Sequence, residues 1–333
     1  MPAAESDLPE IVPFLCGVFG MSETYRLYQP AVMHWKCFAP HPFWPGSRAY
    51  LLRFRGKIAG YGCVVPMDLL TREGAVRAAI FIDWAGSRSV PGAGVLIFKG
   101  VMELVDALFG IGGSDAARKV IPAMGFAQKY ELAHFTRVTR PLARLARNRP
   151  WTWKGPLRAG RDLLRLAQPA PRVPKTWSAR EVGRFDESVA PVLPAPGDSA
   201  IVLRRSPELL NYLLDCPAAR MHGFLLYAAG RLAGYCILSQ VEGEARIAEL
   251  WTASGKAADW DAAFALAARL ASRLPGACAV RIAATFPAAQ SAARRAAWRL
   301  SEREPVYLKD PQGKIPAGVP LALGLTANDY AYL

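Results

Sequence analysis

Few side chains in this sequence are of the kind that bind metal ions. Its 333 residues include 4 histidines and 6 cysteines, and the cysteines are scattered with no Cys-x-x-Cys pair and no histidine at ligand spacing. We therefore expect reduced, mostly buried thiols and no metal site.

A long apolar run is also lacking. The longest one near the start, 11–21, is interrupted by Pro13 and is shorter than the roughly 20 residues that cross a bilayer. The first ten residues contain acidic side chains and no Lys or Arg, unlike a secretory signal. We expect a cytoplasmic protein without a transmembrane segment.

Apolar residues are nevertheless abundant. They make up 52% of the chain, against 20% charged residues, and this balance is typical of a well-packed globular protein. The length suits two ordinary domains, each with its own core.

An internal similarity supports two domains. Residues 55–63 (RGKIAGYGC) resemble residues 229–236 (AGRLAGYC), and Gly60 corresponds to Gly234 at an offset of 174 residues. In each copy an apolar run precedes a turn at Gly56 or Gly230, and a second apolar run follows. This pattern predicts two antiparallel strands.

The same order of elements follows in both copies. A third strand ends near Asp83 or near Glu249, and it is followed by a helix (94–107 or 261–274), a strand (107–111 or 277–283) and a short helix (115–123 or 288–297). We expect an α/β protein of two tandem domains, each with a mixed, partly antiparallel sheet flanked by helices. One continuous sheet through both halves would contradict two separate units.

A basic, proline-rich connector separates the copies. Residues 137–175 hold 11 Lys and Arg against Asp162 alone, a net charge of +10 out of +14 for the chain. We place the domains at 1–136 and 176–333. Part of the connector is typical of an amphipathic helix with the leucines Leu157, Leu163, Leu164 and Leu166. It is either a solvated helix or a surface for an anionic membrane, nucleic acid or acidic polymer, and no pattern indicates sequence-specific DNA binding.

The segment Ser114–Phe126 contains the clearest motif. Ala117, Gly125 and Phe126 match the closing motif of the GNAT superfamily of N-acetyltransferases, and the chain resembles its tandem form among bacterial polysaccharide-biosynthesis proteins. Ser114 stands where that family has Asn, and Ile121 stands where it often has the Tyr that protonates the thiolate.

The resemblance implies an acetyl-CoA or other acyl-CoA co-substrate. Its pyrophosphate loop corresponds to Ser89–Gly94, because glycines let the backbone approach phosphates and a helix N-terminus favours negative charge. The candidate cofactor-binding residues are Arg88, Val90, Gly92, Ala93, Gly94, Val95 and Ser114. The matching loop of the second copy has Gly255 alone, so we interpret the C-terminal domain as degenerate.

Catalytic candidates follow from the same comparison. Asp83 ends the strand before the loop and is our first candidate for the general base, and Glu249 holds the analogous place in the second copy. Tyr130 or His134 is the candidate acid. Trp35 and Lys36 are the candidate acceptor-binding residues, since an aromatic beside a cation suits a sugar or an anion.

Three functions fit these features. The first is an N- or O-acyltransferase acting on a polar acceptor such as a sugar or glycan precursor. The second is a Fem-like aminoacyltransferase whose basic connector faces tRNA. The third is a silent binding protein, because a fold does not guarantee chemistry.

Overall fold

The computed structural model describes residues 1–147, 154–166, 172–197 and 199–333. Its helices are α1 Leu8–Phe19, α2 Pro30–Cys37, α3 Ala93–Met102, α4 Asp115–Ala123, α5 Pro141–Arg147, α6 Lys154–Leu166, α7 Pro207–Leu214, α8 Ala257–Arg273 and α9 Pro287–Arg295. Its strands are β1 Ala49–Phe54, β2 Lys57–Thr71, β3 Gly74–Gly86, β4 Ala107–Ile111, β5 Ala127–Val138, β6 Trp177–Val182, β7 Ile201–Leu203, β8 Arg220–Ala228, β9 Arg231–Val241, β10 Glu244–Thr252, β11 Ala279–Ala284, β12 Arg299–Lys309 and β13 Leu321–Ala322.

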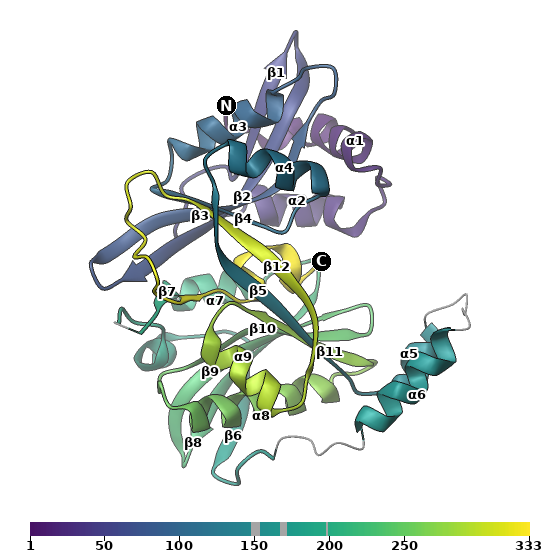
Figure 1. Ribbon diagram of the computed structural model, residues 1–333, viewed down its shortest axis with the longest axis vertical. Helices are drawn as coiled ribbons and strands as arrows, with labels where there is room; N and C mark the ends of the chain where they lie inside the picture. The colour runs from purple at the N-terminus through teal and green to yellow at the C-terminus, as the bar shows by residue number, and fades with distance from the viewer. Residues whose placement is uncertain (148–153, 167–171, 198) are drawn as a thin grey trace.

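Both halves present the same order of elements. The order strand, strand, strand, helix, strand, helix, strand runs from β1 to β5 and again from β8 to β12. The mixed α/β fold is as predicted, with helices on the faces of the sheet (Figure 1). Helix α3 is shorter than predicted and ends at Met102.

The prediction of separate sheets is wrong. One continuous sheet of 13 strands runs through both halves of the described chain, in the order β13-β7-β2-β3-β4-β12-β5-β11-β10-β9-β8-β6, with β1 on β2. Figure 1 shows β5 and β12 crossing at the centre of the molecule. The physical reason is that the last strand of each half pairs with a strand of the other half.

The two exchanged strands are β5 and β12. Strand β5 pairs antiparallel with β11 of the second half, where Val138 faces Ala279. Strand β12 pairs with β4 of the first half, where Val306 faces Ile111, and it also pairs with β5. The boundary at 136 therefore falls inside a strand that belongs to the second half's sheet.

The core is shared in the same way. One buried cluster includes Ile11 and Leu15 of α1, Tyr61 of β2, Ile237 of β9 and Tyr332 near the C-terminus. Five of the six cysteines are buried, as predicted. Among the described helices, none has the length and apolarity to cross a membrane.

The connector forms two helices rather than an extended linker. Helices α5 and α6 make a hairpin that projects from the second half (Figure 1). The predicted amphipathic helix is confirmed as α6. The residues 148–153 and 167–171 of the connector lie outside the described residues.

Candidate functional site

A gap between two parallel strands creates the main candidate site. Strands β3 and β4 pair only from Ala78 to Ile80 and from Ala107 to Phe109, although β3 continues to Gly86. Beyond this pairing lies a cavity of about 350 Å³, here called the β3–β4 hollow. Its polar lining residues are Tyr25, Tyr28, Asp83, Trp84, Ser114, Asn328, Asp329 and Tyr330.

A bulge in β3 sets the position of Asp83. The register between β2 and β3 shifts so that Tyr61 faces Ala85 while Cys63 faces Ile82. The extra residues on β3 include Asp83, which has a φ of +51°. Left-handed backbone is costly for a residue with a Cβ, and such outliers gather at functional sites.

Asp83 is ion-paired with a buried lysine. The Lys36 ammonium contacts Oδ2 of Asp83, and the side chain of Lys36 is 3% exposed. Burial lowers the pKa of Lys36, but the Asp83 carboxylate together with Cys37 and Cys63 more than offsets burial and raises this pKa above its ordinary value. Lys36 is therefore a fixed positive charge behind Asp83.

A second carboxyl group faces the same charges. Burial, and then the negative charge of Asp83, raises the pKa of Asp329 to about 6. The Lys36 ammonium acts in the opposite direction and is the smaller effect. Two carboxyl groups of one hollow are thus in different environments, an arrangement that separates acid and base roles.

A hydrogen-bonded chain holds a tyrosine at the hollow. Tyr330 donates to Oε1 of Glu304 at 2.8 Å, and Nε2 of His134 lies 2.9 Å from Oε2 of the same carboxylate. Burial, and then the Glu304 carboxylate, raises the pKa of Tyr330, so its hydroxyl stays protonated near neutral pH. Gly112 has a φ of +64°, and a Cβ there would lie 2.9 Å from Oε1 of Glu304, so a larger residue would be strained and would press on this carboxylate.

The predicted pyrophosphate loop lies where expected, between β3 and α3. Gly92 is the N-cap of α3, with a φ of +84°, and Arg88 is exposed in the loop. A Cβ at Gly94 would lie 2.6 Å from Nε1 of Trp84, which makes this glycine a close contact with a wall of the hollow. The Nε1 atom of Trp84 is buried and has no hydrogen-bond partner in the described chain.

In the second half the equivalent gap is filled. Strands β10 and β11 pair only at Glu244–Arg246 and Ala279–Arg281, so they separate as β3 and β4 do. The C-terminal segment 321–327 occupies the gap. Leu323 donates to Oγ1 of Thr285 at 2.9 Å, and a Cβ at Gly324 would contact the carbonyl oxygens of Ala248 and Ala283 from both strands.

Glu249, the counterpart of Asp83, is fully engaged. Arg205 donates to its two carboxylate oxygens at 2.9 and 3.1 Å, and Thr326 of the C-terminal segment donates to Oε2. Tyr235 is a further donor at 3.4 Å. The structure thus places Glu249 in a buried ion pair of the second half and away from the hollow.

Of the predicted site residues, Asp83 and Ser114 line the hollow, whereas the loop residues 88–95, Lys36, His134, Tyr130 and Trp35 do not. Tyr130 is half-buried on β5. Trp35 is buried, stacks on Tyr212 and donates its indole N–H to the Tyr212 carbonyl at 3.0 Å. Ile121, at the position of the missing Tyr, is an apolar wall residue of the hollow.

Sequence reasoning missed Asp329, Tyr330 and Glu304. They lie beyond or late in the second copy and belong to no motif, so no local signal identifies them. Only the tertiary structure brings them to a hollow whose other residues come from the first half.

The architecture is similar to that of several solved structures. A tandem GNAT protein from the clavulanic acid biosynthesis pathway covers 93% of this chain with 97% of its own, at 16% identity and a TM-score of 0.55. This chain has a tandem GNAT fold.

Other structures with the GNAT fold also match. GCN5-related N-acetyltransferases from Anabaena variabilis and Kribbella flavida share 11% and 13% identity with TM-scores of 0.59 and 0.55. Each covers 93% of this chain, with 72% and 71% of their own length. No protein-family model and no curated protein matches the sequence.

Proposed function

We propose that this protein is an acyl-CoA-dependent acyltransferase with one active site, the β3–β4 hollow. The observation that carries the proposal is the open gap between two parallel strands, next to the glycine-bounded N-terminus of α3 and lined by Asp83, Asp329 and Tyr330. A gap of this kind accepts an extended thioester arm, and the helix N-terminus accepts its phosphates.

The co-substrate, acetyl-CoA or a longer acyl-CoA, binds along this path. The N–H groups of Gly94 and Val95 in the first turn of α3 and the side chain of Arg88 bind the pyrophosphate. The buried N–H of Trp84 donates to a carbonyl of the arm, which would satisfy its hydrogen-bonding capacity. The thioester carbonyl then lies at the bulge that carries Asp83.

Proton transfer is divided between two residues that follow the C-terminal segment, Asp329 and Tyr330. Asp329 takes the proton from the acceptor amine, because a base works best when its pKa is near the working pH. Asp83, engaged by Lys36, attracts the ammonium form of the acceptor and keeps the pKa of Asp329 high. The neutral amine nitrogen forms the new bond to the carbonyl carbon, the carbon–sulfur bond breaks, and Tyr330 protonates the leaving thiolate. The second proton of the nitrogen then returns to the Tyr330 oxygen through water, and Asp329 releases its proton to solvent.

The acceptor is a polar amine such as an amino sugar or a glycan precursor. Two carboxyl groups favour a cationic acceptor over an anionic one, and the rings of Tyr25 and Tyr28 in the same lining offer apolar faces of the kind that sugars contact.

Binding and turnover test the proposal in sequence. Isothermal titration with acetyl-CoA should show saturable binding, and addition of amino sugars should release the free thiol of CoA. An absence of binding at millimolar acetyl-CoA would overturn the assignment.

A further inference from the structure

A second cavity lies between the α5–α6 hairpin and the sheet, and five of the residues that line it are arginines. Its volume is about 160 Å³. One water needs about 10–15 Å³, so this space accepts a larger group. This cavity is here called the arginine hollow. Its arginines are Arg137, Arg144, Arg165, Arg281 and Arg299.

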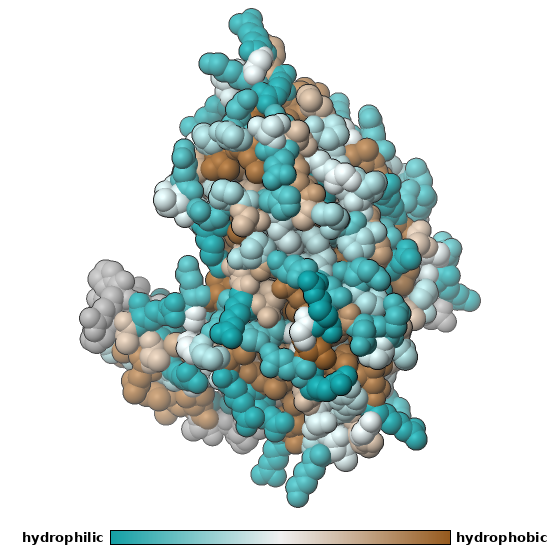
Figure 2. Space-filling view, turned by 180° about the vertical axis from the view of Figure 1, so that it is seen from behind, coloured by the Kyte–Doolittle hydropathy of each residue, from teal (hydrophilic) through white to brown (hydrophobic). Residues whose placement is uncertain are grey.

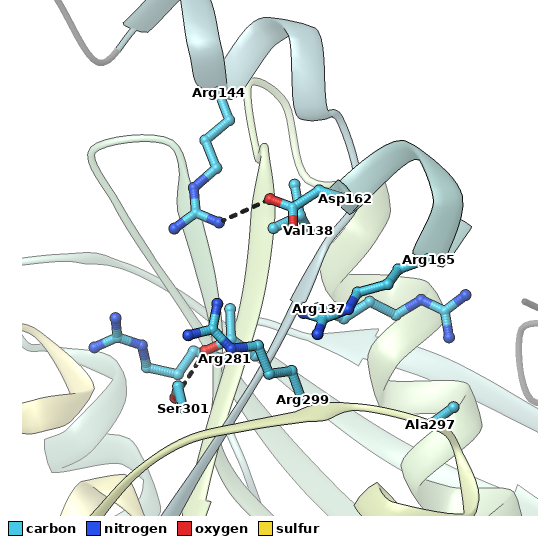
Figure 3. A pocket seen from close by; sticks show the side chains of 10 residues that line it. Arg137, Val138, Arg144, Asp162, Arg165, Arg281, Ala297, Arg299 and Ser301 are labelled. Atoms are coloured by element: carbon cyan, nitrogen blue, oxygen red, sulfur yellow. Dashed lines mark hydrogen bonds and ion pairs between the residues drawn. The ribbon is translucent and has the colours of Figure 1, made fainter. Parts of the chain in front are cut away.

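The arginines come from both sides of the cavity. Figure 3 shows Arg144 and Arg165 extending from the two helices toward the strands that carry the other three. Thr136 and Ser301 add hydroxyl groups to the lining. The cavity shares no lining residue with the β3–β4 hollow, so the inference does not depend on the proposed function.

Apart from Arg137, the arginines of the lining have few carboxylate partners among the described residues. Asp162 is the acidic residue of the lining, and it also pairs with Arg161 at 3.1 Å, closer than Arg144 at 3.7 Å. Glu244 is shared between Arg246 and Arg281. Neither Arg165 nor Arg299 has a carboxylate partner within the described ranges.

Further observations indicate that a ligand belongs here. The Nε atom of Arg281 is buried and has no hydrogen-bond partner in the part of the chain that the structure describes. Burial also lowers the pKa of Arg137. Like charges around one cavity repel each other, and an anion with several oxygens offsets this repulsion while satisfying the unpaired Nε–H of Arg281.

We propose that the arginine hollow binds the phosphate groups of a polyanionic ligand. Guanidinium groups stay charged and match phosphate oxygens two at a time, so phosphate fits this lining better than a single carboxylate does.

The phosphate has two possible sources, a soluble phosphorylated compound or a lipid headgroup. The hairpin that covers the cavity has exposed leucines, and Figure 2 shows the apolar patch that they help to form. They are Leu142, Leu157, Leu163 and Leu164. Apolar and cationic residues on one helix are typical of segments that lie on anionic membranes.

The test compares two double variants of equal charge. Arg165→Gln with Arg299→Gln alters the hollow, and Arg220→Gln with Arg231→Gln removes two exposed arginines elsewhere. The probes are inorganic pyrophosphate, measured by calorimetry, and phosphatidylcholine vesicles with or without phosphatidylglycerol, measured by cosedimentation. Melting temperatures confirm that both variants fold.

The hollow variant should bind at least one probe about tenfold more weakly than wild type, with the control unchanged. Loss of pyrophosphate binding alone identifies a soluble phosphate, and loss of binding to phosphatidylglycerol vesicles identifies a lipid headgroup. The proposal is wrong if wild type binds neither probe, or if both double variants bind equally well.

Discussion

The two halves share an element order but differ in the gap between their central parallel strands, which is open in one half and filled in the other. In the first half the gap is open, and a bulge sets Asp83 at its edge. In the second half the segment 321–327 fills the gap, and Glu249, the counterpart of Asp83, forms an ion pair with Arg205. The same strand geometry therefore provides a ligand site in one half and a docking place for the chain itself in the other.

The largest difference is expected between the carboxyl groups of the two halves. Asp329→Asn should lower kcat by about 10²–10⁴-fold, since it removes the general base. Glu249→Gln should instead mainly lower stability, by about 3–5 kcal/mol, because it leaves Arg205 buried without its charge partner. Steady-state kinetics and thermal denaturation of both variants distinguish these effects. A larger loss of kcat in Glu249→Gln than in Asp329→Asn would place the chemistry in the second half.

The dependence of stability on pH should also differ between these carboxyl groups. The pKa of Asp329 is raised to about 6 in the folded protein, so the folded state holds this proton more tightly than the unfolded state. Its contribution is fully present below about pH 4 and is lost as the pH rises through about 6, a change of about 2 to 3 kcal/mol. Urea denaturation at pH 4.5 and 7 should show this loss in wild type and in Glu249→Gln. If Asp329→Asn shows the same loss, another group is responsible.

The loops before α3 and α8 allow a matched substitution. Gly94→Val places side-chain atoms against Trp84 and should weaken CoA binding about tenfold or more, because the loop can no longer donate to phosphate. Ala258→Val, at the same helix position in the second half, should leave the affinity unchanged. Calorimetry with CoA measures the affinity of both variants.

Gly92→Val is a second test of the same loop. A Cβ at Gly92 meets no atom within 4 Å, so this substitution acts only through the positive φ. Full affinity in both glycine variants would argue against the loop as the phosphate site.

The smallest effect concerns the segment that fills the second gap. Thr285→Val removes the hydroxyl that bonds the segment at Leu321 and Leu323, and it should lower kcat several-fold by displacing the Asp329 that follows. Thr252→Val is the control, because this buried threonine bonds Ser254 and not the segment. Both variants should lose about 1–3 kcal/mol of stability, and only the first should lose activity. Equal activities would show that Asp329 is positioned independently of the filled gap.

Sequence patterns predicted the local structure well. The bounds of β4 and α4 agree with the structure. An apolar run defines β4, and Ser114 caps α4 by accepting from the Ala117 N–H at 3.2 Å. The loop at Gly92 was also placed correctly, whereas the strand predicted to end near Asp83 continues to Gly86. These features depend on residues close together in the chain.

Features that depend on distant residues were not predictable in the same way. The alternation of apolar and polar residues in β5 does not indicate that this strand pairs with β11, because the backbone hydrogen bonds are the same for any partner strand. Trp35 suggested an exposed acceptor site, yet Tyr212 of the other half covers it. Asp329 reaches the hollow through the path of the C-terminal segment, which no motif encodes.

The exchange of β5 and β12 has a consequence for the time course of biosynthesis. Ile111 on β4 cannot find its partner Val306 until the ribosome has made most of the second half. At a rate of synthesis of about 5–20 residues per second, the edge of β4 stays unpaired for about 10 to 40 s. During this interval the first half has an unpaired strand edge, which is a site for aggregation. We expect that chaperone dependence in the cell is set by this delay, and that neither half expressed alone would be soluble.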